Sequence, residues 1–442
     1  MATVGFFPIA RPTFDLNLAR SKVQAVQISL KQQYNLITPQ ALIMSKDDAA
    51  LALDQLLSND LDAIIVLQAT FADTTLVQHI AQELKRPILL WALPEAHQGG
   101  RLRLNSFCGV NLAAHALRRA GLSYTYVYAD PDDKDALAKI EQFVKASVVI
   151  KRLATTRIGR IGDHPQGFET CQYDATMLRS HLGIDVVTMP LERLFAQAQN
   201  TKEASISDAK NDLQQSLSNL DQVNSDEVDG TIKTFAALRQ IAREQDIHGF
   251  AVRCWPEFFT EMGCAACGAM SMMSDRQVPC SCEADVNGTI TQIILQELSG
   301  EPAFGSDIVS FDLNKDQAVV WHCGLAPLSM ADVTYRPQAA LHSNRQKALL
   351  MQFPLKSGRV TLARLSEASG ELRLVIGSGE MLEAPPAFTG TSGTLRFDRG
   401  AQNTMDTLID HGLEHHISLT YGDYVDELQM FAKLCQLPTL LL

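Results

Sequence analysis

The chain has 442 residues, which is too long for one ordinary hydrophobic core, so we expect two or three domains. Its hydrophobic content of 46% and charged content of 20% are normal for a globular protein, and no apolar run reaches the roughly 20 residues that span a bilayer. A net charge of -12 argues against nucleic acid as the main partner, although local arginines can still bind an anionic small molecule.

The first residues do not combine a basic segment with an apolar one, so we predict no signal peptide. The 9 cysteines are an odd number in a long chain and form no regular disulfide framework, which favours a reducing compartment. We therefore expect a cytoplasmic protein without a membrane partner.

The first part of the chain alternates apolar strands with amphipathic helices. The helix predicted over residues 17–34 has its apolar positions mostly on one side, and residues 62–68 form a continuous apolar run typical of a buried strand. This alternation predicts a mostly parallel sheet covered on both faces by helices. Further strands are predicted at residues 4–10, 41–44 and 87–93, and further helices at 47–59 and 76–85.

Residues 94–121 connect this part to a second round of strands and helices. The polar segment 197–229 keeps Leu213, Leu217 and Leu220 at helical spacing, so we interpret it as an exposed helix with a mobile start rather than a disordered linker. Strands are predicted at residues 123–129, 155–162, 183–189 and 248–254, with a helix at 173–183.

After about Gly300 strand patterns recur without long helices, as in an antiparallel sheet or small barrel, and a helix at 424–437 closes the chain. The predicted fold class is α/β, with two doubly wound parallel-sheet domains at 1–145 and 146–305 and a β-rich, barrel-like domain at 306–442. The strands of this last domain are predicted at residues 307–313, 317–324, 350–355, 359–366, 371–382 and 393–398.

Four cysteines have a spacing that invites a metal-site interpretation. Cys264, Cys267, Cys280 and Cys282 form C-x2-C, a gap and C-x-C, whereas a zinc or iron–sulfur site needs four converging thiolates. The surrounding GCAACGAMSMM is small and apolar, and the second pair is one residue too close for a standard knuckle. Core packing of free cysteines is favoured, and no metal is assigned there.

No phosphate-binding or nucleophile motif is present. RIGRIGDHPQGF matches neither G-x-G-x-x-G nor a Walker sequence, so a nucleotide-dependent enzyme lacks support. Its Arg160 and His164 follow a predicted strand and either receive a polar ligand or belong to a plain connection. There is no G-x-S-x-G elbow, and His322 and Cys323 are strand neighbours that we expect to point to opposite faces.

Acidic residues bracket an apolar helical segment in the middle of the chain. Glu283 ends a semi-apolar predicted strand, where an unpaired carboxylate would be costly, and Asn287 or Thr289 can cap the helix that follows. Ordinary roles remain open, because Asp285 can favour a helix N-terminus and Asp307 can lie in an exposed turn.

His415 and His416 precede an apolar strand near the end of the chain. Carboxylates combined with one imidazole form a hard, oxygen-rich site suited to Mn²⁺ or Mg²⁺. Spacing alone does not show that groups so far apart in the sequence converge.

Three stretches carry a resemblance to a known family. ARPTFD at residues 10–15 resembles an R-P-T/V-x-D segment, and EADVNG, LSG and FGSD between residues 283 and 307 resemble an E-N-D-x-x-N-G…L-T-G…F-A-D block. HHISLTYG at residues 415–422 resembles a terminal H-x-x-x-x-Y-G. By these motifs and its domain order the whole chain resembles the L-fucose isomerase-like family and, more distantly, the L-arabinose isomerases.

The resemblance implies an aldose–ketose isomerase whose metal ligands are Glu283, Asp307 and His416. The expected ion is Mn²⁺, with Mg²⁺ or Co²⁺ as alternatives, and the two carboxylates would also be the catalytic acid/base pair. Arg11 would contact substrate near a subunit boundary, so the resemblance implies a homo-oligomer with its active site at an interface. The N-terminal domain would then serve substrate recognition and oligomerisation.

The implied reaction moves a proton between C2 and C1 of an open-chain sugar through an enediol. A divalent cation polarises the carbonyl, and positioned carboxylates accept and return the proton. Trp255, Glu257 and His322 are candidates for sugar contacts, and core packing is the alternative for Trp255.

The chain departs from the family pattern at substrate-facing positions. EADVNG is one residue shorter, Gly412 replaces an asparagine, and the aromatic-rich loop after the third strand keeps only Phe71. An anionic sugar such as the sulfonated hexose sulfoquinovose is therefore an alternative substrate, with Arg11, Arg160 or His164 receiving its charge. A sugar-binding relative without turnover is a further alternative.

Overall fold

The computed structural model of the protein describes residues 1–84 and 86–442, apart from the side chains of residues 203–205. Within these residues the chain divides into two compact units, Met1–Arg152 with Asp426–Gln436 and Leu153–Val425 with Leu437–Leu442. The finer division at 145/146 and 305/306 stays a prediction. No helix in the described part of the chain has the length and apolar character needed to cross a membrane.

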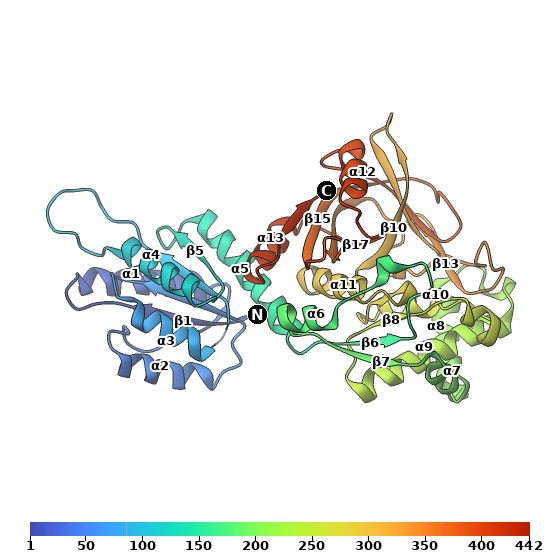
Figure 1. Ribbon diagram of the computed structural model, residues 1–442, viewed down its shortest axis with the longest axis horizontal. Coiled ribbons are helices and arrows are strands. Elements are labelled where there is room, and N and C mark those ends of the chain that lie inside the picture. The colour runs from blue at the N-terminus through green and yellow to red at the C-terminus, as the bar shows by residue number, and fades with distance from the viewer. Residues whose placement is uncertain (85) are drawn as a thin grey trace. The chain divides into compact units, whose positions relative to one another are not determined.

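The N-terminal unit is built on a parallel sheet with the strand order β2-β1-β3-β4-β5 (Figure 1). Every residue of β3 and β4 is buried, which explains their continuous apolar sequences. The strands are β1 Thr3–Ile9, β2 Asn35–Ile37, β3 Ala63–Gln68, β4 Ile88–Ala92 and β5 Tyr124–Tyr128. The helices are α1 Leu16–Lys31, α2 Lys46–Leu57, α3 Thr74–Leu84, α4 Ser106–Arg119, α5 Lys134–Leu153 and α13 Val425–Leu434.

Two local predictions for this unit are wrong. Residues 41–44 form no strand apart from a bridge between Ile43 and Ile9, because the backbone N–H groups of Met44 and Ser45 bond to the Asp48 carboxylate at the start of α2. The segment 94–121, predicted as a connection, contains helix α4. Lys85, the last residue of the helix predicted over 76–85, lies outside the described residues.

The second unit contains another parallel sheet, with the strand order β7-β6-β8-β9. In the polar segment that precedes α9, Leu213, Leu217 and Leu220 are buried, so this predicted helix is less exposed than expected. The strands are β6 Arg157–Ile161, β7 Asp185–Met189, β8 Gly249–Val252 and β9 Cys280–Ser281. The helices are α6 Ala175–Leu182, α7 Leu191–Gln199, α8 Glu203–Ser216, α9 Ser225–Gln245, α10 Cys267–Ser274 and α11 Val286–Ser299.

The same unit carries the antiparallel barrel, and this confirms the predicted fold class. The barrel closes because β15 pairs with both β14 and β16, which completes the ring β10-β11-β16-β15-β14-β17. Helix α12 Ala401–Asp410, which the pattern did not predict, packs on β10 and β16. The strands are β10 Phe304–Asp312, β11 Gln317–His322, β12 Gln338–Ala340, β13 Leu350–Pro354, β14 Gly358–Ser366, β15 Arg373–Leu382, β16 Thr391–Phe397, β17 His416–Tyr421 and β18 Thr439–Leu441.

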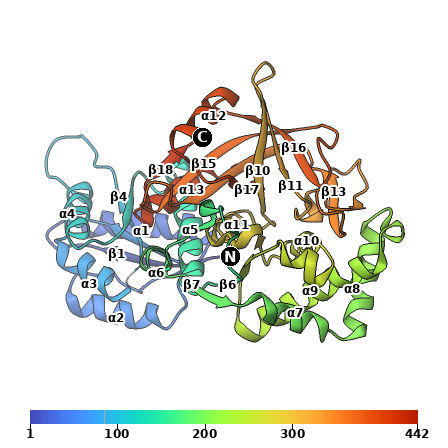
Figure 2. The same cartoon turned by 45° about the vertical axis from the view of Figure 1, so that its right-hand side comes forward.

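Helix α11 joins the second parallel sheet to the barrel. It packs on β8 and also on β14 and β17 (Figure 2). Partners on several sides explain why Ile290, Ile293 and Ile294 are buried together with Thr289 and Gln292. The acidic residues noted in the sequence therefore flank a core helix.

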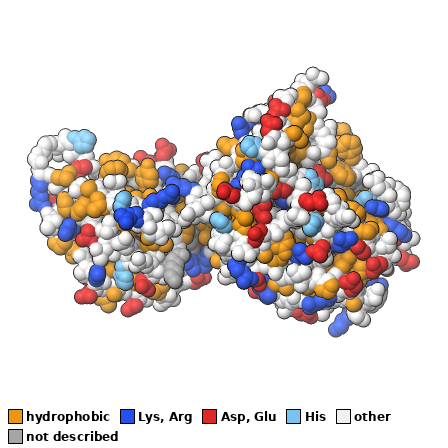
Figure 3. Space-filling view, viewed as in Figure 1, with side chains coloured by type: hydrophobic (Ala, Val, Ile, Leu, Met, Phe, Trp, Pro, Cys, Tyr) orange, Lys and Arg blue, Asp and Glu red, His pale blue; other side chains and the backbone are white. Residues whose placement is uncertain are grey.

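The visible face of each unit carries charged side chains of both signs. Figure 3 shows acidic and basic side chains interspersed over the visible face of each unit. The net charge of -12 therefore does not appear there as a field of one sign.

Because α11 packs on the sheet and the barrel, we expect Ile294→Ala to lower the free energy of unfolding of the second unit by about 2–5 kcal/mol. Ile294 is 0% exposed, whereas Ile409 is 77% exposed, so Ile409→Ala is the control and should change stability by less than about 0.5 kcal/mol. Urea unfolding followed by circular dichroism measures both variants. Equal effects of the two substitutions would contradict the packing of α11.

Candidate metal centre

Strand register brings Asp307 and His416 together. In the antiparallel pair β10–β17, Asp307 lies directly opposite His416, and in the pair β10–β11 it lies opposite Trp321. Directly opposite residues project to the same face of a sheet. The two residues, 109 positions apart in the sequence, therefore point to one side of the barrel wall.

Glu283 reaches the same place from the parallel sheet. The strand predicted over 278–283 ends at Ser281, and Glu283 and Ala284 adopt left-handed backbone conformations with φ of 57° and 56°. Two consecutive non-glycine residues in this region are costly and are typical of functional sites. The turn aims the Glu283 carboxylate toward the barrel.

The carboxylates of Glu283 and Asp307 both lie close to one nitrogen of the His416 imidazole. His416 Nε2 lies 3.7 Å from Glu283 Oε2 and 3.6 Å from Asp307 Oδ1. These separations exceed hydrogen-bond length, but two ligands of one cation with bonds of about 2.1 Å can lie up to about 4.2 Å apart. Asp307 Oδ1 is buried and has no hydrogen-bond partner within the described residues. His416 therefore belongs to two groups of donor atoms that could hold a cation, one with Glu283 and one with Asp307.

Asp285 orients this imidazole. His416 Nδ1–H donates to Asp285 Oδ2 at 2.9 Å, which leaves the Nε2 lone pair facing Glu283 and Asp307. Asp285 also accepts the backbone N–H of Gly288 at 2.9 Å and so caps α11. The prediction that Asn287 or Thr289 caps this helix is wrong, because Asp285 occupies the cap position.

A buried arginine, Arg364, holds Asp285 in place. Arg364 on β14 pairs with Asp285, and their side chains are only 2% and 1% exposed. Burial would raise the pKa of Asp285, but the charge of Arg364 and the His416 hydrogen bond lower that pKa well below its usual value. Sequence reasoning missed Arg364, although a single arginine within the apolar run VTLARLS is a signal for a buried ion pair.

Glu283 has its own partners. Trp255 Nε1–H donates to Glu283 Oε1 at 3.1 Å, and His415 Nε2 lies 3.0 Å from Oε2. Burial raises the pKa of Glu283, but the His415 hydrogen bond and the neighbouring His416 lower it overall. Trp255, predicted to contact sugar, thus holds a carboxylate. His415 was not predicted, yet its donor atom lies within 4.8 Å of those of Cys171, Glu283 and His416.

His322 also borders the centre. Its donor atom lies within 4.8 Å of those of Asp307 and His416, and its ring centroid is 5.6 Å from that of His416. The expectation that His322 and Cys323 point to opposite faces is wrong, since His322 Nδ1 lies 3.1 Å from Cys323 Sγ. Strand β11 ends at His322, and Gly324 turns the chain with a φ of 85°.

Three other predicted residues are engaged elsewhere. Arg253 Nε–H donates to both carboxylate oxygens of Glu257, at 2.9 and 2.8 Å. Arg160 pairs with Asp163, and the backbone carbonyl of His164 accepts from Arg253 Nη1 at 3.4 Å. Arg160 lies in β6 near its carboxyl end, and His164 and Glu257 lie in the segments that follow β6 and β8.

Arg11 belongs to the N-terminal unit and is exposed. Its backbone N–H donates to Thr70 Oγ1 at 2.8 Å, and its guanidinium lies 5.9 Å from the centroid of the Phe71 ring. Close by in the sequence, Asp15 caps α1 and pairs with Arg103. These groups follow the carboxyl ends of β1 and β3, where ligands of parallel sheets commonly bind.

Known families match both ends of the chain. Residues 5–154 match the family described as fucose/sulfoquinovose isomerase, N-terminal domain, and residues 320–441 match L-fucose isomerase, C-terminal domain. A sulfoquinovose isomerase from Alkalicoccus urumqiensis is 32% identical over 99% of this chain and 99% of its own length. A sulfoquinovose isomerase from Priestia aryabhattai is 31% identical over 99% of this chain and 98% of its own.

Because Asp285 orients His416 and compensates Arg364, we expect Asp285→Asn to weaken Mn²⁺ binding by 10–100-fold, a range typical of lost outer-shell partners. Arg364 would keep only the more distant Glu414, whose Oε2 lies 3.8 Å from its Nε, so stability should also fall, by less than the roughly 3–5 kcal/mol of a fully unpaired buried charge. Isothermal titration calorimetry and urea unfolding measure the two effects. Asp246→Asn is the control, because the Asp246 side chain is 80% exposed. Unchanged affinity in a folded Asp285→Asn variant would contradict the orienting role.

Proposed function

Because the chain belongs to the fucose/sulfoquinovose isomerase family and is a sugar isomerase, we propose that it interconverts sulfoquinovose and the corresponding ketose. The proton moves between C2 and C1 of the open-chain sugar through an enediol. The observation that carries the proposal is the convergence of Glu283 and Asp307 on Nε2 of His416.

Glu283, Asp307 and His416 are the residues that would hold the divalent cation. Two carboxylates and an imidazole suit Mn²⁺, with Mg²⁺ and Co²⁺ as alternatives. A bound divalent cation supplies Lewis-acid polarisation of the sugar carbonyl. Asp285 keeps the Nδ1 proton of His416 in place, so Nε2 remains available as a ligand.

The same carboxylates would transfer the proton. The lowered pKa of Glu283 keeps it ionised near neutral pH, so it is ready to accept a proton from carbon. Trp255 and His415 each bond one of its oxygens and fix the orientation of the carboxylate. Asp307 has an unpartnered buried oxygen in the described part of the chain and is the second candidate acid or base.

The sulfonate of sulfoquinovose needs a positively charged side chain that does not already have a carboxylate partner. Arg160 pairs with Asp163. Arg345 has no carboxylate partner among the described residues, and its guanidinium lies 5.8 Å from the centroid of Trp255, the residue that bonds Glu283. We therefore assign Arg345 to the sulfonate, and Arg160 and His164 remain candidate contacts to the rest of the sugar.

Oligomerisation and cellular location complete the proposal. From the family resemblance, Arg11 would reach the site of a neighbouring subunit, in a homo-oligomer with an interface active site. The nine cysteines, all of them in the described residues, are free thiols, which supports a cytoplasmic location.

In heavy water with Mn²⁺ and sulfoquinovose, we expect formation of the ketose and deuterium incorporation at C1 or C2. Removing the ion with EDTA should abolish both, and Glu283→Gln should lower kcat by about 100-fold or more because the proton acceptor is lost. Nuclear magnetic resonance measures turnover and exchange together. Glu301→Gln, at an exposed position, is the control and should retain activity.

Two outcomes of this experiment would overturn the proposal. Full activity after thorough chelation excludes the metal-dependent reaction. Tight sugar binding without any deuterium uptake favours a sugar-binding protein that keeps the fold without turnover.

If Arg345 binds the sulfonate, Arg345→Gln should raise KM for sulfoquinovose by about 10-fold, since one charge-assisted hydrogen bond is worth about 1.5–3 kcal/mol. KM for glucose, which lacks the sulfonate, should change little. Steady-state kinetics with both sugars separate these effects. Arg336→Gln is the matched control at an exposed position. Equal changes for both sugars would show that Arg345 does not recognise the anion.

A further inference from the structure

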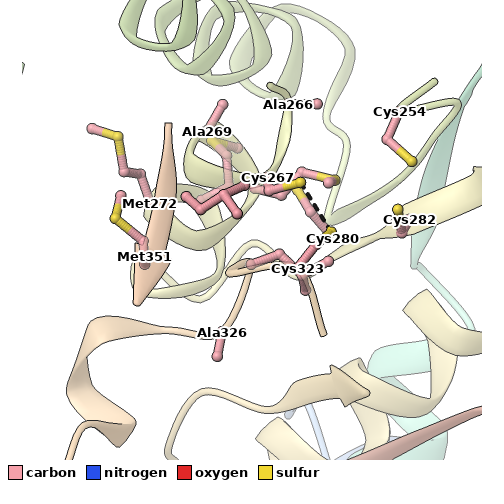
Figure 4. Packing of buried hydrophobic residues seen from close by; sticks show 14 of the residues in the cluster. Cys254, Ala266, Cys267, Ala269, Met272, Cys280, Cys282, Cys323, Ala326 and Met351 are labelled. Carbon is pink, nitrogen blue, oxygen red and sulfur yellow. Dashed lines mark hydrogen bonds between the residues drawn. The ribbon is translucent and has the colours of Figure 1, made fainter. Parts of the chain in front are cut away.

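A group of buried thiols lies beside the candidate metal centre. Cys254 follows β8, Cys267 starts α10, Cys282 follows β9 and Cys323 follows β11. Cys267 Sγ lies 3.2 Å from Cys323 Sγ (Figure 4), and the sulfur atoms of Cys282 and Cys323 lie within 4.8 Å of each other. Cys323 is therefore a neighbour of both Cys267 and Cys282.

This set differs from the one that sequence spacing singled out. The Cys264 sulfur packs against Gly230 of α9, away from the contact between Cys267 and Cys323. Cys323 belongs to the group although it is 41 residues beyond Cys282. Cys323 makes these contacts because the turn after β11 brings it beside the other thiols.

The geometry favours dithiol chemistry over a metal site. The Sγ–Sγ separation of 3.2 Å is shorter than the edge of about 3.8 Å in a zinc–thiolate tetrahedron with bonds of about 2.3 Å. His322 Nδ1 already accepts the backbone N–H of Cys323 at 2.8 Å, so its lone pair is engaged.

Cys323 is the thiol best placed to react. It is 8% exposed, compared with 2% for Cys267 and 4% for Cys282. The contact with the Cys267 thiol lowers the pKa of Cys323, and the same contact raises the pKa of Cys267. A thiolate in contact with a second thiol is the arrangement that forms a disulfide on oxidation.

We propose that Cys323 and Cys267 form a reversible disulfide when a hydroperoxide reaches the protein, and that this slows the isomerase. In the first step the Cys323 thiolate attacks the hydroperoxide, so that an S–O bond forms, the O–O bond breaks, and an alkoxide leaves and takes up a proton. In the second step Cys267 attacks the resulting sulfenic acid, an S–S bond forms, and the S–O oxygen leaves as water. The two sulfurs lose two electrons, and the hydroperoxide is reduced to an alcohol and water.

The effect would reach the candidate metal centre through His322. Closing a sulfur separation of 3.2 Å to a disulfide bond of about 2.05 Å requires a movement of about 1 Å. Cys323 directly follows His322, which lies within 4.8 Å of the donors of Asp307 and His416. The slowed turnover rests on the proposed function, whereas formation of the disulfide does not.

The test treats the full-length, reduced protein with hydrogen peroxide after EDTA has removed bound metal. Non-reducing digestion and mass spectrometry should then show the peptides containing Cys267 and Cys323 linked, with the loss of two hydrogens. After Mn²⁺ is restored, turnover should be several-fold lower and should recover with dithiothreitol. Oxidised methionines do not recover with this reagent, so reversal separates the two kinds of damage.

Variants identify the roles of the two sulfurs. In Cys267→Ala, the Cys323 sulfenic acid should persist and react with dimedone, and Cys264→Ala should behave like the wild type. Absence of the link in folded wild-type protein overturns the proposal, even if a variant fails to fold. A link that leaves turnover unchanged overturns the regulatory effect and leaves the proposed isomerase intact.

Discussion

The buried ion pair between Asp285 and Arg364 is the constraint on which the centre depends. Asp285 caps α11 and also bonds His416 at the start of β17, while Arg364 extends from β14. An unpaired charge at this depth would cost several kcal/mol, so these three elements keep one arrangement. That arrangement leaves Nε2 of His416 facing the two carboxylates.

The centre lies where the parallel sheet and the barrel share helix α11. Glu283 comes from the turn before that helix, whereas Asp307 and His416 come from paired barrel strands. The left-handed turn at Glu283 and the unpartnered Asp307 oxygen are unfavourable in a purely structural role. The proposed divalent cation would account for both, because it would attract the carboxylates and supply the missing partner.

His322 connects two kinds of chemistry. On one side of His322 lie the oxygen and nitrogen donors of Asp307 and His416, which suit a hard cation. Cys323 on the other side belongs to the group of buried thiols, which suit oxidation rather than catalysis. An isomerase does not need a thiol for proton transfer, so the cysteines can respond to redox conditions without taking part in the reaction.

Hydrophobic periodicity alone predicted the buried strands β3 and β4, helix α1 and the succession of two parallel sheets and a barrel, because it records which side of each element is buried. The family motifs indicated Glu283, Asp307 and His416. Only the tertiary structure decided that Asp285 bonds His416, that Arg364 compensates Asp285 and that Cys323 meets Cys267. These contacts join residues separated by 131, 79 and 56 positions, so they depend on strand register and turn geometry that no local pattern encodes.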